Sequence, residues 1–157
     1  MRSNPYMQIE SLLTQQRTLC HVTCTSKKRS LEVLASLIAE GSDGIDADEL
    51  FQQLVARERL GSTGIGEGIA IPHCRFKTAG ATIGALMTLA TPIDFDSVDS
   101  QPVDVIFAML VPENAENAHL QTLAMLAEQL QNPRFVQALR RAETGDDLYR
   151  AAIEADL

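Results

Sequence analysis

Tryptophan is absent from this sequence, and aromatic residues make up only 4% of it, so the core must be aliphatic. The three cysteines form an odd set, which favours free thiols in a reducing compartment over a disulfide framework. No apolar run reaches the roughly 20 residues that cross a bilayer, and the N-terminus lacks the apolar stretch of a signal peptide. We therefore expect a cytoplasmic protein with no membrane insertion.

Positive charge is also scarce, since 13 Lys and Arg face 21 Asp and Glu, for a net charge of −8. An acidic surface repels phosphate backbones and anionic membranes, so nucleic-acid binding is not expected. It leaves room for a basic protein partner, because opposite charges speed encounter. The length of 157 residues and the apolar content of 45% suit a single domain over 1–157. We expect residues 1–7 to be flexible.

Hydrophobic patterning predicts strands at 18–25, 69–71, 81–90 and 103–111. Helices are expected at 8–14 (a short turn), 27–40, 46–60, 118–130, from 133, and from 144 to the end. Successive strands without intervening helices indicate a mixed or antiparallel sheet. The predicted fold is α/β of an α+β-like kind: a single mixed sheet of about five strands with helices on both faces.

Several helix ends carry recognisable capping residues. Ser26 precedes the helix over 27–40, Asp46 with Glu49 forms a capping box, and Asn132-Pro133 opens a further helix. In the helix over 118–130, the pattern predicts a buried face. Its expected members are Leu120, Leu123, Ala124, Ala127 and Leu130.

His73 is the first candidate for chemistry. It follows Pro72 and the short strand 69–71, just past a glycine-rich stretch that we expect to be irregular. A neutral imidazole is a good nucleophile near pH 7, and a backbone carbonyl can fix its second nitrogen. Consecutive turn amides, at Ser62, Thr63 and Gly64, can form a concave nest for an oxyanion. From spacing alone, a strand-end histidine that merely caps a carbonyl is an equally good interpretation.

Two further residues are candidates of lower weight from the sequence alone. His119 starts a helix and could donate a hydrogen bond to a phosphate, although a surface histidine is the simpler interpretation. Arg57 lies in the last turn of a helix before the glycines and could balance phosphate charge with its planar fork. From the sequence alone, a solvated helix-end charge is the better interpretation of Arg57. Glu58 and Arg59 are interpreted as surface charges.

Other kinds of site are not indicated. Gly64-x-Gly66-x-Gly68 lacks the following helix of a dinucleotide fold and the lysine of a Walker motif, so no nucleotide cofactor is expected. The Cys and His spacings match no zinc motif, and we expect no metal. His73 and Cys74 are neighbours on an extended segment, so they should point to opposite faces and cannot pair as base and nucleophile.

The run RERLGSTGIGEGIAIPH over 57–73 resembles the phosphorylation-site signature of enzyme IIA domains of the mannitol/fructose type, from the phosphoenolpyruvate-dependent phosphotransferase system. The resemblance continues at 92–95, 101–104, 110–112 and 119–123. Within that family, the chain most resembles the nitrogen-regulatory branch. It shares with that branch the segment SKKR at 26–29 and the occurrence without an attached sugar-specific domain. At Cys74, family members often carry glycine, and the thiol adds a possible redox sensitivity.

The resemblance implies a phosphotransferase component with a phosphohistidine at His73, formed through Nε2. It implies that His119 and Arg57 stabilise the phosphoryl group, with no metal or cofactor. The implied donor is an HPr-like phosphocarrier, and the implied output is regulation of target proteins according to phosphorylation state. A sugar-specific enzyme IIA that passes phosphate to an enzyme IIB is the alternative. A binding module that has lost phosphotransfer is a third possibility, against which the three residues argue.

Overall fold

The structure is a computed structural model that describes residues 8–115 and 118–154. The segment 1–7, for which flexibility was predicted, lies outside the described residues. Within them, no helix combines the length and the apolar character needed to cross a membrane.

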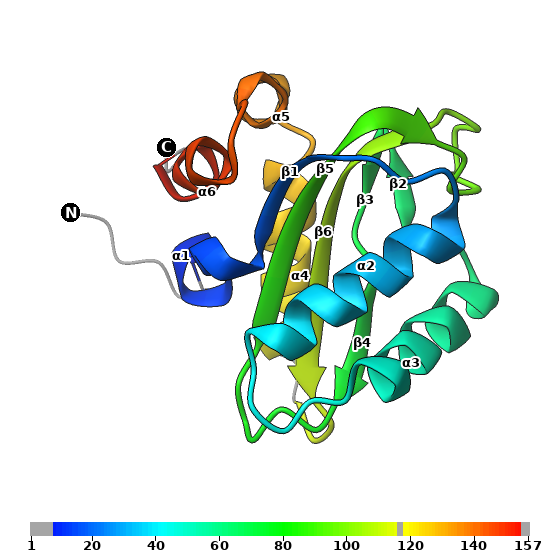
Figure 1. Ribbon diagram of the computed structural model, residues 1–157, viewed down its shortest axis with the longest axis vertical. Coiled ribbons are helices and arrows are strands. Elements are labelled where there is room, and N and C mark those ends of the chain that lie inside the picture. Colours follow the sequence, from blue (N-terminus) through cyan, green and yellow to red (C-terminus); the bar gives the residue numbers. More distant parts are fainter. Residues whose placement is uncertain (1–7, 116–117, 155–157) are drawn as a thin grey trace.

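A mixed sheet of six strands forms the centre of the described part of the chain (Figure 1). Its strands are β1 Thr18–Val22, β2 Gly64–Gly66, β3 Ile69–Ala70, β4 His73–Phe76, β5 Ile83–Ile93 and β6 Val103–Pro112. The order is β1-β5-β6-β3-β2, and β4 also pairs with β6. β5 runs antiparallel to β6, whereas β3 and β4 run parallel to it. The predicted mixed sheet is confirmed, with six strands where about five were expected.

Helices cover both faces of this sheet, as predicted. They are α1 Ile9–Leu12, the 3-10 helix η1 Gln15–Arg17, α2 Lys27–Glu40, α3 Ala47–Leu60, α4 Ala118–Gln129, α5 Pro133–Arg141 and α6 Gly145–Glu154. Figure 1 shows α2 and α3 on one face and α4 on the other. Each face has its own apolar core: Leu34 and Leu54 pack in the first, Leu126 and Leu139 in the second.

Local capping chemistry explains where several helices begin. The Ser26 hydroxyl accepts a hydrogen bond from the Arg29 amide at 3.1 Å and so caps α2. Asn132 does the same for α5, with its side chain 3.0 Å from the Arg134 amide. Asp46 caps α3 through the amide of Asp48 rather than through a full capping box. These predictions of helix starts are confirmed.

The glycine-rich stretch differs from its prediction. Gly64–Gly66 form a short strand, β2, that pairs antiparallel with β3, so the segment is partly regular. The expected strand 69–71 also ends at Ala70, and a new strand starts at His73. β3 and β4 both pair with β6, because the Pro72 carbonyl still accepts from the Met109 amide at 2.8 Å across the gap. Long-range pairing therefore overrides the local glycine content.

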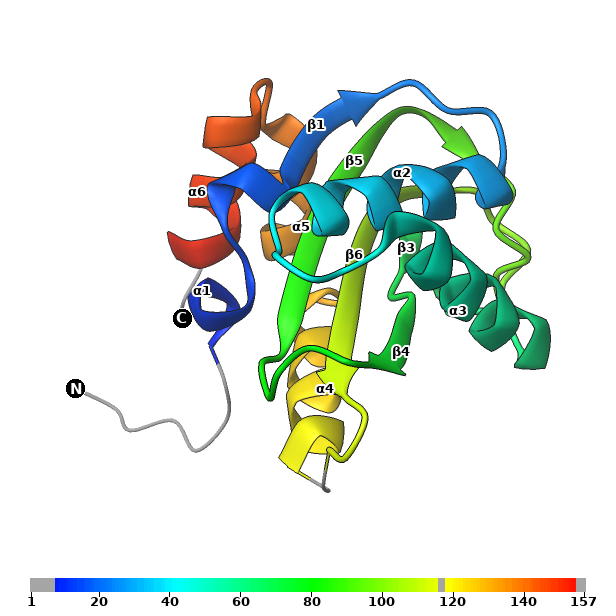
Figure 2. The same cartoon turned by 60° about the horizontal axis from the view of Figure 1, so that its bottom comes forward.

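The buried face of α4 was predicted incorrectly. Leu120 is 60% exposed and Ala124 is also exposed, whereas Leu126 is fully buried. Leu130, which follows the helix, is buried, and Leu123 and Ala127 are half-buried. Figure 2 shows the first turn of α4 extending past the end of β6. Leu120, Ala124 and Glu128 form one exposed i, i+4 row, whereas Thr122, Leu126 and Leu130 form the buried row. The helix is therefore rotated about its axis relative to the predicted face.

Candidate functional site

His73 is half-buried and opens β4, where it pairs in register with Met109 of β6. Its Nδ1 lies 2.7 Å from the carbonyl oxygen of Ile71. A carbonyl oxygen can only accept, so the neutral ring carries its proton on Nδ1 and a lone pair on Nε2. The geometry therefore fixes both the orientation of the ring and its nucleophilic nitrogen.

The surroundings of His73 keep it neutral. Burial lowers the pKa of its imidazole below the ordinary value, which the Ile71 carbonyl partly opposes. The positive charge of Arg57 lowers this pKa further, and the negative charge of Glu58 raises it. Because the net change is downward, the ring is an unprotonated nucleophile near neutral pH.

Neighbouring residues on β4 point to opposite faces, as expected. Met109, the partner of His73, belongs to the core under α4, whereas Cys74 packs against the core under α2 and α3. Burial raises the pKa of the Cys74 thiol to about 12. A thiol that stays protonated is a poor nucleophile, which disfavours the redox sensitivity considered from the sequence.

Arg57 serves the end of its own helix. Its Nη1 donates to the carbonyl of Gly61 at 2.9 Å, which caps the last turn of α3. Its charge nevertheless acts on His73, where it lowers the pKa. The two interpretations left open by the sequence therefore coexist, since the side chain caps a helix and also contributes to the field at the imidazole.

His119 is held on the same side of the sheet as His73, because α4 packs on the face that contains Met109. Its Nδ1 lies 2.9 Å from the hydroxyl of Thr82, a buried residue just before β5. When the Thr82 hydroxyl donates to Nδ1, the ring proton lies on Nε2, which can then donate to an anion. Thr82 could not be recognised from the sequence, because its partner lies 37 positions away.

Two of the three predicted nest amides, those of Thr63 and Gly64, have partners inside the protein. The Thr63 amide donates to the Glu58 carboxylate at 3.1 Å, and the Gly64 amide donates to the Ser62 hydroxyl at 3.0 Å. That hydroxyl in turn donates to the carbonyl of Phe95 at 2.8 Å. These bonds shape the loop, and an oxyanion would have to displace them, so the nest stays a prediction.

Glu58 was interpreted as a surface charge, and this is wrong. Its side chain is only 5% exposed, and Lys27 Nζ lies 2.8 Å from it. It also accepts a hydrogen bond from the hydroxyl of Thr63. A signal was present in the sequence, because Glu58 continues the i, i+4 row of Leu50 and Leu54, both buried. Arg59 is exposed, as expected.

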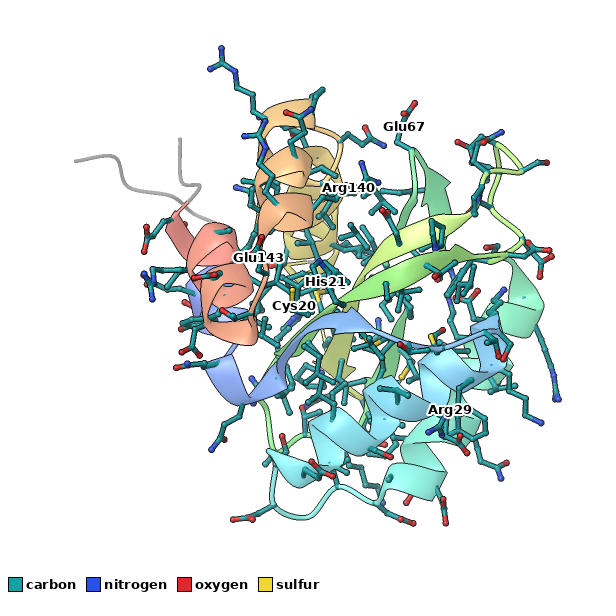
Figure 3. All side chains as sticks on the ribbon, turned by 45° about the horizontal axis from the view of Figure 1, so that its top comes forward. Cys20, His21, Arg29, Glu67, Arg140 and Glu143 are labelled. Carbon is teal, nitrogen blue, oxygen red and sulfur yellow. The ribbon has the colours of Figure 1, made fainter. Side chains whose placement is uncertain are left out.

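Two arginines fasten loops at the ends of the strands that lead to His73 and His119. Arg140 of α5 grips Asp104 through two nitrogens and donates to the carbonyl of Glu67 at 2.9 Å, which pins the turn between β2 and β3 (Figure 3). A Cβ on Gly68, where φ is +82°, would lie 2.5 Å from Arg140 Nη2. Arg75 of β4 donates to the carbonyl of Ala115 at 2.9 Å and so ties down the loop before α4.

Among the residues that the structure describes, no group of three or more His, Cys, Asp or Glu side chains could hold a metal ion. The candidate site residues supply a neutral imidazole with Nε2 available at His73, a guanidinium at Arg57 and a second imidazole at His119.

Comparison with known proteins identifies the family of the chain. Residues 11–154 match the family described as "Phosphoenolpyruvate-dependent sugar phosphotransferase system, EIIA 2", and the chain belongs to that family. It is 44% identical, over 94% of its length and 96% of the relative's, to a nitrogen regulatory protein of Pseudomonas aeruginosa.

Solved structures show the same fold. The nitrogen regulatory protein IIA-Ntr of Neisseria meningitidis superposes with a TM-score of 0.81 at 34% identity, covering 91% of this chain and 97% of that one. The mannitol IIA protein of Escherichia coli superposes with a TM-score of 0.73, covering 89% of this chain and 98% of that one. At 16% identity, this second likeness concerns the fold alone.

Proposed function

We propose that this protein is a phosphocarrier of the nitrogen-regulatory branch of the phosphotransferase system. It accepts a phosphoryl group from an HPr-like protein onto Nε2 of His73, and it regulates target proteins according to its phosphorylation state. The observation that carries the proposal is the bond from His73 Nδ1 to the Ile71 carbonyl, which leaves Nε2 as the nucleophile. The likeness to nitrogen regulatory proteins over nearly the whole chain favours this branch.

The reaction moves a phosphoryl group between two imidazoles. The lone pair of His73 Nε2 attacks the phosphorus of the donor's phosphohistidine, and the donor's N–P bond breaks with its electron pair returning to the donor ring. Attack and departure occur in line through a loose, metaphosphate-like state. No nucleotide or metal is needed to balance this step, because acceptor and leaving group are chemically alike.

Arg57 and His119 would stabilise the charge that develops on the phosphoryl oxygens. Arg57 would exchange its bond to the Gly61 carbonyl for one to the phosphoryl group, and His119 would donate from Nε2 while Thr82 holds Nδ1. Neither residue is the acceptor. The protein would act in the cytoplasm, where a phosphoenolpyruvate-dependent donor chain is available.

A sugar-specific role is the second candidate. The fold shared with a mannitol IIA protein is compatible with a chain that passes phosphate on to an enzyme IIB. The two candidates share the first transfer onto His73 and differ in what happens next: a binding switch in one case, onward transfer in the other.

The first transfer is tested by incubating the protein with phosphoenolpyruvate, enzyme I and either HPr-type carrier, followed by intact mass measurement. We expect one phosphoryl group that is labile in acid and stable in base. His73→Ala should take up none. One equivalent transferred to folded His73→Ala protein would exclude His73 as the acceptor.

The regulatory step is tested by titrating a binding target against free, phosphorylated and His73→Ala protein. Phosphorylation adds nearly two negative charges at the site, so a target that packs an apolar or acidic patch over His73 should bind the free form and His73→Ala alike, and the phosphorylated form more weakly. Equal affinity for all three would favour a relay to an enzyme IIB.

A further inference from the structure

A chain of hydrogen bonds connects a buried ion pair to the ring of His73. The Glu58 carboxylate accepts from both the amide and the hydroxyl of Thr63. The Thr63 carbonyl then accepts from the Ile71 amide at 2.9 Å. The Ile71 carbonyl, in turn, accepts from His73 Nδ1 at 2.7 Å. Each hydrogen bond in this series therefore positions the residue that makes the next bond.

The ion pair at the start of this chain is well enclosed. The Glu58 side chain is 5% exposed and that of Lys27 is 19% exposed. Lys27 Nζ also lies 4.9 Å from the centre of the Phe95 ring and 3.8 Å from the Asp96 carboxylate. Placing a carboxylate in such a site carries a desolvation penalty, so hydrophobic packing alone does not account for Glu58 at this position.

Glu58 also sits beside the other charged group of the site. Arg57 precedes it on α3, and the Arg57 guanidinium bonds to Gly61 in the same loop that Glu58 holds through Thr63. Fixing Thr63 therefore limits both the end of α3, which carries Arg57, and the segment that orients His73.

We propose that Glu58 is a positioning residue for phosphoryl transfer: by holding Thr63, it sets the orientation of the His73 ring through the Thr63–Ile71 link. This inference rests on the proposed function for its kinetic consequence only, because the orientation of His73 can be observed without any phosphoryl group. Glu58 does not itself touch the reacting atoms.

The central variant is Thr63→Val, which keeps the shape of the side chain and removes the hydroxyl that Glu58 accepts. Thr63→Ser, which keeps the hydroxyl, is its conservative partner. Glu58→Gln removes the charge and one acceptor oxygen. Glu32→Gln is the matched control, because Glu32 pairs with Arg29 in an exposed ion pair on the neighbouring helix α2.

The kinetic readout is single-turnover transfer from a phosphorylated HPr-type carrier. We expect Thr63→Val and Glu58→Gln to slow transfer at saturating carrier by about 10-fold, the scale of one hydrogen bond to a charged group. The half-saturating carrier concentration should change by less than about two-fold, because docking surfaces are intact. Thr63→Ser and Glu32→Gln should behave like wild type. The double variant should be no slower than the slower single variant, because both remove one contact.

The second readout is the ¹⁵N spectrum of the His73 imidazole. Wild type should show the Nδ1–H form, and Thr63→Val and Glu58→Gln should show a mixture of the two neutral forms. Wild-type rates and an unchanged spectrum in folded Thr63→Val would overturn the inference. If wild type accepts no phosphoryl group but the spectra change as expected, the proposed function fails and the positioning role stands.

Discussion

The two halves of the candidate site are held in very different ways. On the α3 side, Glu58 joins Lys27, Thr63 and the glycine loop in a buried network. On the α4 side, His119 has one described hydrogen bond, to Thr82, and its neighbour Leu120 is 60% exposed. The His73 imidazole is thus held by a buried network, whereas the His119 imidazole lies at a helix end with one described hydrogen bond.

This difference suits a group that must be reached by another protein. A nucleophile benefits from an orientation set before the donor arrives, because pre-organisation lowers the barrier to transfer. A stabilising donor on a less constrained turn can adjust when the phosphoryl group and the partner surface arrive. The comparison predicts that substitutions in the α3 half change the rate of phosphoryl transfer. Substitutions in the first turn of α4 should change the free energy of unfolding little.

The largest expected effect separates the two ends of α4. Leu126→Ala should lower the free energy of unfolding by about 2–5 kcal/mol, because it leaves a cavity in a fully buried position. Leu120→Ala should change it by less than about 0.5 kcal/mol. Urea denaturation of both variants measures the difference. Equal losses would mean that the first turn of α4 is packed as firmly as the rest.

The next effect concerns transfer rates. Arg57→Ala should slow phosphoryl transfer by at least about 10-fold, which corresponds to about 1.4 kcal/mol for a lost charged donor. His119→Ala should also slow it, without replacing His73 as acceptor. Single-turnover rates from a phosphorylated HPr-type carrier give both numbers. Unchanged rates in both variants would reduce Arg57 to its capping bond with Gly61 and His119 to a surface residue.

A smaller effect is expected at Thr82, the anchor of the α4 half. Thr82→Val keeps the volume and removes the hydroxyl bonded to His119, and a net hydrogen bond contributes about 0.5–1.5 kcal/mol. Transfer should slow by about two- to ten-fold, and Thr82→Ser should restore it. If Thr82→Val slows transfer as much as His119→Ala, the orientation of His119 is its whole contribution.

Whether a feature of the fold or the site could be predicted from the sequence depends on how far apart along the chain its interacting residues lie. The capping bonds of Ser26 and Asn132 reach amides two or three residues away, so the local sequence predicts them. The aliphatic strands 83–93 and 103–112 are likewise visible as apolar runs. His73, His119 and Arg57 were candidates from their positions in the sequence, the family resemblance raised their weight, and their roles remain predictions.

The missed features depend on contacts that the sequence does not display. The partner of Glu58, Lys27, lies on another helix, and that of Thr82 lies 37 positions along the chain. β4 forms because residues 73–76 pair with β6. On their own, these four residues after a proline give little indication of a strand. Leu120 and Ala124 satisfied the helical period, but periodicity alone did not tell which row of α4 faces the core, because Leu126 and Leu130 form a second row with the same spacing.

The smallest expected effect is a pH dependence at the α3 half. Burial and, to a lesser extent, Arg57 lower the pKa of His73 in the folded state, so the unfolded chain binds its proton more readily. Stability should therefore fall as the pH drops through the ordinary histidine pKa of about 6.5, and the loss should be complete below the lowered folded pKa. Above both values, His73 contributes no pH dependence.

His73→Ala isolates this contribution, because all other titrating groups remain in both proteins. The difference in unfolding free energy between wild type and His73→Ala is measured in urea across pH 5–8. It should be constant near pH 8, and as the pH falls toward 5 wild type should lose stability relative to His73→Ala. In an Arg57→Ala background the same trend should persist with smaller amplitude, since burial is the larger cause and the Arg57 charge the smaller. A difference that moves in favour of wild type on acidification would mean that the folded protein holds the His73 proton more tightly than the unfolded chain, which would contradict a neutral nucleophile held by the α3 half.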